Sequence, residues 1–364
     1  MTNGGEMPPS EAGPRARKPR RAADRPKRRA RVTLADVAAE AGVSVGAAGF
    51  VISGRDDMRI SATTQERVRE AARKLNYRPN RAAQALRTGK TGTVGFVSDT
   101  IGSTPFGGAA IRGALDVARE RHKTLFAAET LGDESIEREV IENLRTRDVD
   151  GLVYASMVTR EATLPATVQD TPTVLMNTIV PGSRTTTFVP DDHQGGHDAA
   201  RTLIELGHRD ILVLGEYADS LDRPYALDVR LGGIWEAFEE AALTHRPMVQ
   251  EVNGPDPEDG RRAMADYLAD NGNPEAVIAL NDRLAFGALQ TLGDRVRPGV
   301  DFSVISFDNS DLAHWLVPAL ASLQLPYYEM GRRAMTSLLD GDLESGLTML
   351  PMTLARHDSL RPMG

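Results

Sequence analysis

The chain of 364 residues contains no cysteine, which excludes disulfide bonds and thiolate metal sites. No apolar run approaches the roughly 20 residues that a membrane-spanning helix needs, so we expect no membrane association. Residues 1–31 are basic but lack the apolar block of a secretory signal peptide. Together these three absences predict a cytoplasmic protein.

The formal net charge of −8 conceals two parts of opposite sign. Residues 1–90 carry 20 Lys and Arg against 9 Asp and Glu, whereas residues 91–364 carry 23 against 42. A basic amino-terminal part on an acidic body predicts that only the first part meets a polyanion such as DNA. The alternative is a solvated basic tail that binds nothing.

The pattern along the chain predicts an arm, a small helical domain, a linker and a large domain. Residues 1–31 are rich in Arg and Pro, so we expect a disordered basic arm that either lies along DNA phosphates or only raises solubility. Residues 32–77 contain three segments with helical spacing of apolar residues. Residues 78–91 are Arg-rich and carry a short apolar stripe, which predicts a linker that can form a helix.

Residues 42–46 read GVSVG and match the G-x-S-x-G signature of serine hydrolases. That signature requires a strand before the serine, but the preceding apolar residues recur with helical spacing: Leu34, Val37, Ala38 and Ala41. Thr33 with Asp36 resembles a capping box, Gly42 suits a helix end, and Ser44 suits the start of a second helix. The stretch therefore predicts a helix-turn-helix, and we expect no catalytic residue.

From Thr93 onward, apolar strand-like runs alternate with amphipathic helices. The predicted strands are 93–98, 124–129, 151–156, 172–177, 210–215, 248–253, 276–281 and 303–309. The predicted helices lie near 106–121, 135–147, 194–207, 229–243, 257–271 and 283–294. Such alternation predicts parallel sheets, and two runs of it predict two lobes with a ligand between them at the carboxyl ends of the strands.

Several motifs, taken in order, resemble the lac repressor/galactose repressor family of bacterial transcription regulators. They are VTLADVAAEAGVSVGAAGFVISG, RPNRAAQALRTGKTGTVGFV, Asp191–Gly196 with GHRDILVLG, DVRLGG, ALNDRLAFGAL, VISFDN and PALASLQLPYYEMGRRA, and they span about residues 32–360. The resemblance implies an all-α helix-turn-helix head, a hinge helix and an α/β two-lobed effector domain like a periplasmic sugar-binding protein. It also implies a homodimer or larger oligomer on a pseudo-palindromic double-stranded operator, a small-molecule effector such as a carbohydrate, and no cofactor or metal.

The resemblance assigns domain boundaries and a mechanism. It implies an arm at 1–31, a DNA-binding domain at 32–77, a hinge at 78–91 and an effector domain at 92–364. Lobe one would hold about 92–190 and 323–345, and lobe two about 191–322 with the carboxyl-terminal segment. A ligand would change the lobe angle and thereby operator affinity. The rival interpretations are a solute-binding protein and a degenerate family member without specific DNA binding.

The resemblance also assigns DNA contacts, and the second helix is unusual among them. The implied contacts are Thr33, Ser44, Val45, Gly46, Gly49, Phe50, Tyr77, Asn80, Ala83, Leu86 and Arg87. The outward positions of the second helix, which would enter the major groove, carry none of the family's usual polar readers. Helical phase predicts that Phe50 points outward, and Val45 with Phe50 would then meet thymine methyl groups. The alternative is that Phe50 packs inward.

Within the hinge, the resemblance implies that Asn80, Ala83 and Leu86 face the minor groove and that Leu86 wedges into a base step. It also implies that Tyr77, Arg78 and Arg87 meet the DNA backbone. The alternative is that Leu86 packs on the effector domain. We expect specificity to come more from methyl contacts and DNA shape than from bidentate hydrogen bonds.

The implied effector contacts are Phe106, Arg230, Asn281 and Asp308, with a helix cap or a surface ion pair as the alternative role for each. Leu325 replaces a polar residue that is frequent in the family. We expect Trp315 in the core and not beside the ligand. His193 and His197 have the spacing of a zinc motif but lack its glutamate, so we expect a helix start capped by an aspartate.

Overall fold

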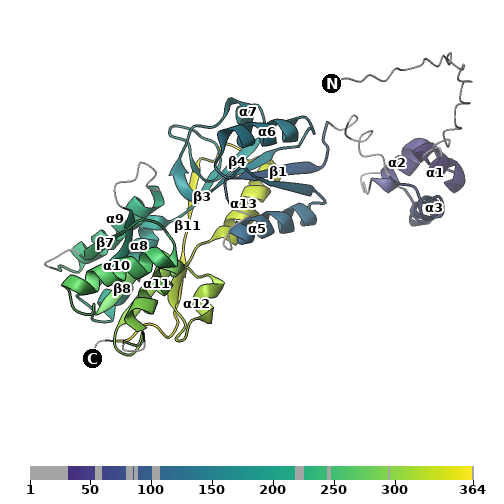
Figure 1. Ribbon diagram of the computed structural model, residues 1–364. Helices are drawn as coiled ribbons and strands as arrows, with labels where there is room; N and C mark the ends of the chain where they lie inside the picture. Colours follow the sequence, from purple (N-terminus) through teal and green to yellow (C-terminus); the bar gives the residue numbers. More distant parts are fainter. Residues whose placement is uncertain are drawn as a thin grey trace, which may run out of the picture. The chain divides into compact units, whose positions relative to one another are not determined.

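A computed structural model describes residues 32–53, 60–78, 85, 89–100, 107–217, 225–243, 247–293 and 296–362 (Figure 1). The chain divides into two units, Met1–Asn80 and Arg81–Gly364, and the division falls inside the predicted linker. The predicted arm at 1–31 lies outside the described residues.

The first unit contains three helices, α1 (Leu34–Ala41), α2 (Val45–Ile52) and α3 (Ala62–Lys74). Thr33 and Asp36 form the capping box that begins α1, and Gly42 ends α1 with a φ of 64°. The hydroxyl of Ser44 accepts the N–H of Ala47 at 3.1 Å and begins α2. All three predicted caps are confirmed, and a helix, not a strand, leads into Ser44.

The apolar faces of these helices meet in a small core. Its buried members are Val37, Ala38, Ala41, Ala48, Val51, Val68 and Ala71. Arg67 of α3 donates from Nε to the carbonyl oxygen of Ala41 at 3.2 Å and so ties α3 to the end of α1. Among the described residues no single helix is long and apolar enough to cross a membrane. Helices α1 and α2 meet that test only together, across a bend of 104°.

The second unit contains two six-stranded sheets, one for each lobe. The first has the order β11–β5–β4–β3–β1–β2, with all neighbours parallel. Its strands are β1 (Thr93–Ser98), β2 (Thr124–Glu129), β3 (Leu152–Glu161), β4 (Thr173–Ile179), β5 (Thr187–Pro190) and β11 (Leu347–Leu350).

The second sheet has the order β12–β10–β9–β8–β6–β7, in which only β12 runs antiparallel to its neighbour. Its strands are β6 (Ile211–Tyr217), β7 (Met248–Val252), β8 (Ala276–Ala279), β9 (Ser303–Asp308), β10 (Ala321–Gln324) and β12 (Thr353–Ala355). The predicted fold class, a helical head with parallel-sheet lobes, is confirmed.

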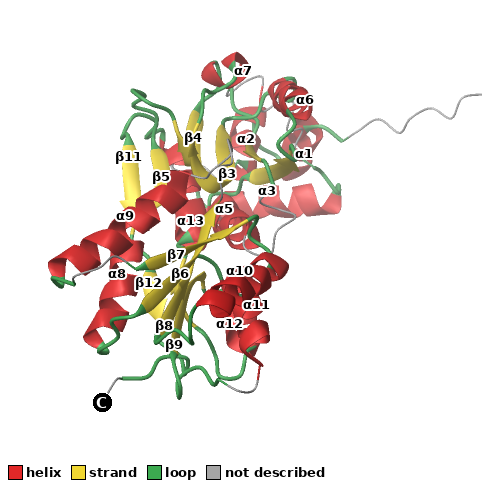
Figure 2. Ribbon diagram, turned by 60° about the vertical axis from the view of Figure 1, so that its left-hand side comes forward, coloured by secondary structure: helices red, strands yellow, loops and turns green. Residues whose placement is uncertain are grey.

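Helices cover both faces of each sheet (Figure 2). In lobe one, α5 (Gly107–Glu120) and α13 (Tyr327–Asp340) pack on one face. On the other face lie α6 (Glu134–Arg145) and α7 (Ala166–Gln169). In lobe two, α8 (Asp192–Glu205) and α9 (Tyr225–Glu240) cover one face. The opposite face carries α10 (Pro257–Asp270), α11 (Asp282–Leu292) and α12 (Asp311–Trp315).

The chain passes between the sheets after β5, after β10 and after β11. The sheets place β10 in lobe two and β11 in lobe one, so the last two passages lie a few residues beyond the predicted boundaries at 322 and 345. Leu325 stands at the second passage, where its side chain packs against the apolar cores of both lobes.

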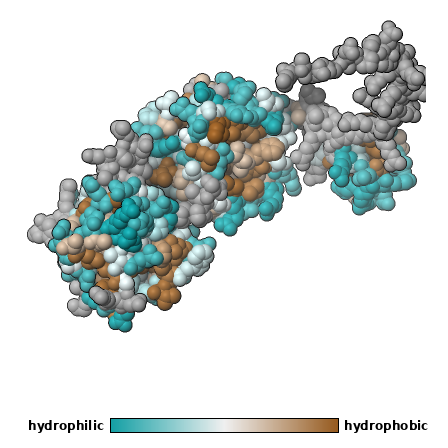
Figure 3. All heavy atoms as spheres, in the orientation of Figure 1, coloured by the Kyte–Doolittle hydropathy of each residue, from teal (hydrophilic) through white to brown (hydrophobic). Residues whose placement is uncertain are grey.

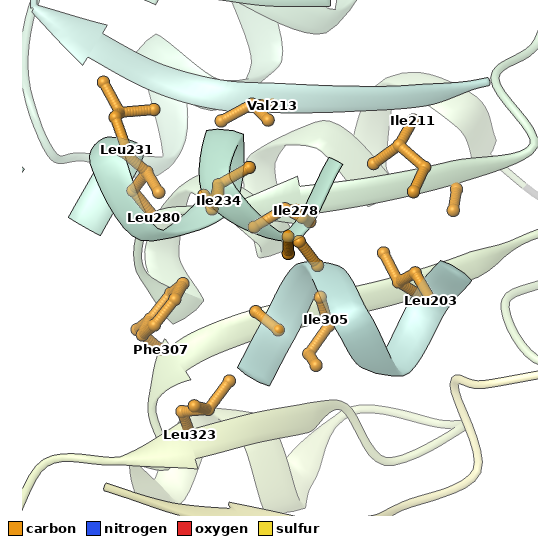
Figure 4. Close-up of a cluster of buried hydrophobic side chains, with 14 of the residues drawn as sticks. Leu203, Ile211, Val213, Leu231, Ile234, Ile278, Leu280, Ile305, Phe307 and Leu323 are labelled. Carbon is orange, nitrogen blue, oxygen red and sulfur yellow. The ribbon is translucent and has the colours of Figure 1, made fainter. Parts of the chain in front are cut away.

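The core of lobe two places strand side chains against α8 and α9 (Figure 4). Val213, Ile278 and Ile305 of the sheet are fully buried there. The two helices touch through glycine: a Cβ atom on Gly196 would lie 2.0 Å from the carbonyl oxygen of Arg230. A Cβ atom on Gly233 would lie 1.9 Å from the carbonyl oxygen of His193. The backbones of α8 and α9 are therefore in direct contact.

This contact predicts opposite effects of alanine at two neighbouring positions of α9. Gly233→Ala forces the helices apart and should lower the free energy of unfolding by about 1–3 kcal/mol. At Gly232 the nearest atom to an added Cβ is a His193 ring carbon at 3.8 Å, which is ordinary contact. Gly232→Ala should therefore be neutral or stabilising by up to about 1 kcal/mol, because Ala favours helix. Urea unfolding of both variants tests this, and equal effects would contradict the close contact.

Candidate functional site

Arg230 lies at the centre of a polar cluster at the carboxyl ends of the lobe-two strands. Its side chain is 7% exposed, and Nε and Nη2 donate to Oδ1 of Asp192 at 3.2 and 2.6 Å. Nη1 donates to the carbonyl oxygen of Leu280 at 2.7 Å, and the guanidinium carbon lies 4.1 Å from the ring centroid of Phe307. Among the described residues these contacts use three of the five N–H groups of Arg230, which leaves two that can serve a ligand.

Asp192 was not predicted as a site residue, although it belongs to the Asp191–Gly196 motif. Its side chain is 5% exposed and forms a buried ion pair with Arg230. Loss of either partner would leave an uncompensated buried charge, which costs about 3–5 kcal/mol. The pair forms because glycine contacts bring the start of α8 next to Arg230 on α9.

Asp308 ends β9 in a strained backbone. Its φ is 105° and that of Asn309 is 49°, both in a region that side-chain-bearing residues rarely adopt. Burial, followed by the charge of Asp282, raises the pKa of Asp308 to about 8, and Arg230 offsets this only in part. At neutral pH most of Asp308 therefore carries its proton, and a protonated carboxyl group can both donate and accept hydrogen bonds.

Asp282, the first residue of α11, holds the loop that carries Asp308. Its carboxylate accepts the hydroxyls of Ser306, Ser310 and Ser322 at 2.5–2.8 Å, and the N–H of Ser310 at 2.8 Å. The side chain is fully buried. Sequence reasoning missed this residue because its partners come from two other strands and a loop, and no local spacing connects them.

Asn281 was predicted to contact the ligand, but its polar atoms serve the fold. Oδ1 accepts the N–H of Leu284 at 2.8 Å and begins α11. Nδ2 donates to the carbonyl oxygen of Pro255 at 3.3 Å. The structure therefore favours the alternative role that the sequence left open, a helix cap.

Lobe one contributes Tyr327 and Asn177 to the same cluster. Oη of Tyr327 donates to the carbonyl oxygen of Met157 at 2.9 Å, and Nδ2 of Asn177 donates to the same oxygen at 3.2 Å. Burial raises the pKa of Tyr327, and the nearby carboxylates of Asp308 and Asp192 raise it further. Asn177 has a φ of 54°, so backbone strain occurs on the lobe-one side as well. The cluster thus joins groups from both lobes.

Three other predictions for this domain have different outcomes. Phe106 lies outside the described residues. Trp315 was expected in the core, but it is 75% exposed, so that prediction is wrong: short α12 buries only Ala313. Asp191 caps α8, which begins at Asp192, by accepting the N–H of Gln194 at 3.1 Å, and this confirms the expected helix start capped by an aspartate.

The histidine pair of α8 lies against acidic residues of α9. Nε2 of His193 lies 3.4 Å from Glu236, and Nε2 of His197 lies 2.9 Å from Glu240. Within the described part of the chain, no three His, Asp or Glu side chains converge as metal ligands.

In the head, the predicted outward positions of α2 divide into two groups. Val45 is 49% exposed and Gly46 is exposed, whereas Gly49 and Phe50 are half-buried. A Cβ atom on Gly49 would lie 3.4 Å from Leu34, so this glycine allows α1 to approach and is not simply outward. Phe50 matches neither the outward position predicted for it nor the inward alternative.

The structure describes only some of the remaining predicted DNA contacts. The side chains of Thr33 and Ser44 serve as helix caps, and Tyr77 packs against the head core while Arg78 is exposed. Asn80, Ala83, Leu86 and Arg87 lie outside the described residues.

Comparison with known proteins gives two domain matches. Residues 33–80 match the model of bacterial regulatory proteins of the lacI family, and residues 200–348 match a periplasmic binding protein-like domain. Among solved structures, the transcriptional regulator CelR–cellobiose complex covers 90% of this chain and 100% of its own, with 27% identity and a TM-score of 0.63. A lac repressor dimer bound to operator and the anti-inducer ONPF covers 90% and 99%, with a TM-score of 0.72 at 22% identity, and shows the fold alone.

Curated relatives match most of the length of the chain. The transcriptional regulator GalS of Salmonella typhimurium is 30% identical over 333 residues, which are 90% of this chain and 96% of the relative. The transcriptional regulator GalR of Escherichia coli is 31% identical over 307 residues, which are 83% and 87%. The chain therefore belongs to the lacI family of bacterial regulatory proteins, which are DNA-binding transcription regulators and not enzymes.

Proposed function

We propose that this regulator represses transcription by binding a pseudo-palindromic operator through its head, and that a small polyhydroxyl effector changes its operator affinity. The observation that carries the effector site is the cluster of Arg230, Asp192, Asp308 and Tyr327, which joins both lobes at the carboxyl ends of the strands. Ligands of open α/β sheets bind at this edge. One similar structure is a cellobiose complex, which supports a carbohydrate.

The chemistry of the cluster suits neutral hydroxyl groups. Arg230 has two N–H donors left for a ligand, and protonated Asp308 offers a donor and an acceptor. By resemblance, Phe106 would supply an apolar wall or stack on a sugar ring. Asn281 takes a smaller part in this proposal, because both ends of its amide are already engaged.

Effector and operator are coupled through the lobe angle. A ligand that contacts both lobes stabilises one angle over another, and the resulting change reaches the hinge helices and the heads. The direction of the response depends on the angle that the ligand prefers.

Because the head would bind chromosomal DNA, we assign the protein to the cytoplasm and, when it is bound to DNA, to the nucleoid.

The head would read DNA through α2 and the hinge. Val45 and Gly46 are the most accessible positions of α2. Val45 has an apolar side chain and Gly46 has none, so neither offers a side-chain hydrogen bond. We therefore propose that thymine methyl contacts and DNA shape supply specificity, together with Leu86 as a minor-groove wedge and Tyr77, Arg78 and Arg87 on the backbone. The basic arm would add phosphate contacts that weaken with salt.

A second copy of the chain would cover apolar side chains that the effector domain exposes. In lobe one these include Phe126, Leu131 and Ile136, which are 43%, 65% and 38% exposed. In lobe two, Trp315 and Val317 are 75% and 96% exposed. Apolar areas are visible on both lobes in Figure 3. Patches of this kind mark protein contacts, and a dimer matches an operator of two half-sites.

Selection from a random duplex pool should enrich a pseudo-palindrome with A·T pairs under α2. Leu86→Ala should weaken binding to the enriched duplex by about tenfold or more, because the bent DNA loses its wedge, with no change in thermal unfolding. Leu347→Ala, at a half-exposed position outside the head, is the control and should bind normally. A strict G·C preference under α2 contradicts the methyl-contact proposal, and affinity that is equal for every duplex supports a degenerate regulator.

Arg230→Lys should remove the response to effector without removing operator binding. Lys keeps a positive charge beside Asp192 but loses the planar fork, so affinity for a neutral sugar should fall by about 10- to 100-fold. The measurement is a thermal-shift screen with cellobiose and neutral hexoses, followed by titration calorimetry. The control is Arg261→Lys on the surface of α10, where the described part of the chain gives Arg261 a single ion-pair partner, Glu258. An unchanged sugar affinity in Arg230→Lys would exclude this residue from the site.

Asp308→Asn should stabilise the protein increasingly as the pH rises. The folded-state pKa of Asp308, about 8, lies above that of an unfolded aspartate, so its contribution is complete below about pH 4 and is lost as the pH approaches 8. Asn mimics the neutral acid at every pH. The melting temperature of the variant minus that of the wild type should be near zero at pH 4, grow toward pH 8 and then level off.

The control for this pH series is Asp301→Asn. Asp301 is a surface residue whose pKa is lowered by the N–H of Arg297, so this variant should show no stabilisation at high pH. A pH-independent difference between Asp308→Asn and the wild type would show that Asp308 is ionised in the folded protein.

A further inference from the structure

Asp150 lies just before β3 and binds the segment through which the linker enters the first sheet. Its Oδ1 accepts the N–H of Thr91 at 2.6 Å and the hydroxyl of Thr91 at 3.1 Å. Its Oδ2 accepts the N–H of Gly92 at 3.1 Å and Nζ of Lys123 at 3.0 Å. The Asp150 side chain is 9% exposed, so these four bonds largely replace water.

These residues belong to the amino ends of three adjacent strands. Gly92 precedes β1, Lys123 precedes β2 and Asp150 precedes β3, and β1 lies between the other two. The backbone continues the ladder there: the N–H of Thr124 donates to Gly92 at 2.9 Å, and the N–H of Asp150 donates to Thr93 at 2.7 Å. Gly92 has a φ of 74° and Gly89 a φ of 66°, which sets the direction of the chain before β1.

At their other ends, β1 and β3 reach the effector cluster. Oδ1 of Asp99, which follows β1, accepts the N–H of Met157 in β3 at 2.9 Å. The carbonyl oxygen of the same Met157 accepts Tyr327 and Asn177 of the cluster. Between these points the two strands pair in continuous register from Gly95 with Leu152 to Ser98 with Ala155. A carboxylate therefore bonds β1 to β3 near the cluster, and another bonds them where the linker begins.

We propose that Asp150 is a positioning residue for DNA binding: its carboxylate fixes the direction in which the linker leaves lobe one, so that a movement of this lobe is passed to the linker. The inference rests on the proposed function of the head and deepens it by naming the contact that carries the coupling. Gly89 and Gly92 have no side chain to restrict the backbone, and nothing lies within 4 Å of a Cβ added to either one, so the bonds to Asp150 supply a restraint that these two residues do not.

The lowered pKa of Asp150 is consistent with strong hydrogen bonds to this carboxylate. Burial alone would raise the pKa of Asp150, but the hydrogen bonds from Lys123 and Thr91 outweigh burial and hold the pKa below its ordinary value. The carboxylate is therefore ionised at neutral pH, and its hydrogen bonds are charge-assisted and strong.

Lobe two offers a matched control in Glu275. This residue precedes β8, and its carboxylate accepts the N–H groups of Arg209 and Asp210, just before β6, at 2.9 and 3.1 Å. The pKa of Glu275 is lowered mainly by the Arg209 N–H. It thus binds a strand entry as Asp150 does, but no linker follows from that entry.

The test compares Asp150→Asn with Glu275→Gln in the full-length protein. The probes are a duplex selected from a random pool by the wild type and amide hydrogen exchange. Asp150→Asn should speed exchange at Thr91 and Gly92 by about tenfold or more and weaken duplex binding by about fivefold or more. Glu275→Gln should speed exchange at Arg209 and Asp210 but leave duplex affinity within about twofold.

The proposal is overturned if Asp150→Asn binds the duplex within about twofold of wild type, or if Glu275→Gln weakens it equally. Should Asp150→Asn not fold, Lys123→Gln removes the charged Nζ bond to Oδ2 but keeps the bonds from Thr91 and Gly92, and it must show a smaller loss in the same direction. If the wild type enriches no duplex, the proposed function fails. In that case amide exchange still tests the contact between Asp150 and the segment before β1. If Asp150→Asn leaves exchange at Thr91 and Gly92 unchanged, this contact is excluded.

Discussion

The buried ion pair of Arg230 and Asp192 is the constraint on which the candidate effector site depends. The pair exists because Gly196 and Gly233 let the backbones of α8 and α9 touch, which brings the start of one helix beside a side chain of the other. Arg230 is committed to Asp192 and only partly offsets the burial and the Asp282 charge that raise the pKa of Asp308. The helix contact at Gly196 and Gly233 thus fixes where Arg230 acts in the cluster.

Local sequence patterns predicted most of the fold. The caps at Thr33, Gly42 and Ser44 were readable because each acts within four residues, and β1 and β2 begin and end where the pattern placed them. Short strands such as β5 and β10 were missed, because four residues hold too little periodicity. The exposure of Trp315 could not be predicted from the sequence either, because it depends on the packing of α12, of which only Ala313 is buried.

The candidate site was predictable only where a motif marked it. Arg230 and Asp308 came from the family resemblance and do lie together, whereas Asp282, Asp192 and Tyr327 were missed. Their roles depend on contacts across 24 to 40 residues, in the case of the Asp282 serines, or on the approach of the two lobes. Asn281 was assigned to the ligand because a strand end is a usual place for ligand residues, but the same position also begins a helix.

Leu325 affects how freely the two lobes can rotate relative to each other where the chain passes between the sheets after β10. Its side chain touches both apolar cores, and dispersion contacts have no preferred direction. A polar side chain there would hold one angle through hydrogen bonds, whereas a leucine resists separation of the cores but tolerates rotation between them. The two lobes would thus have a broad, shallow distribution of angles, and a ligand that contacts both lobes, as proposed above, would need little affinity to narrow it.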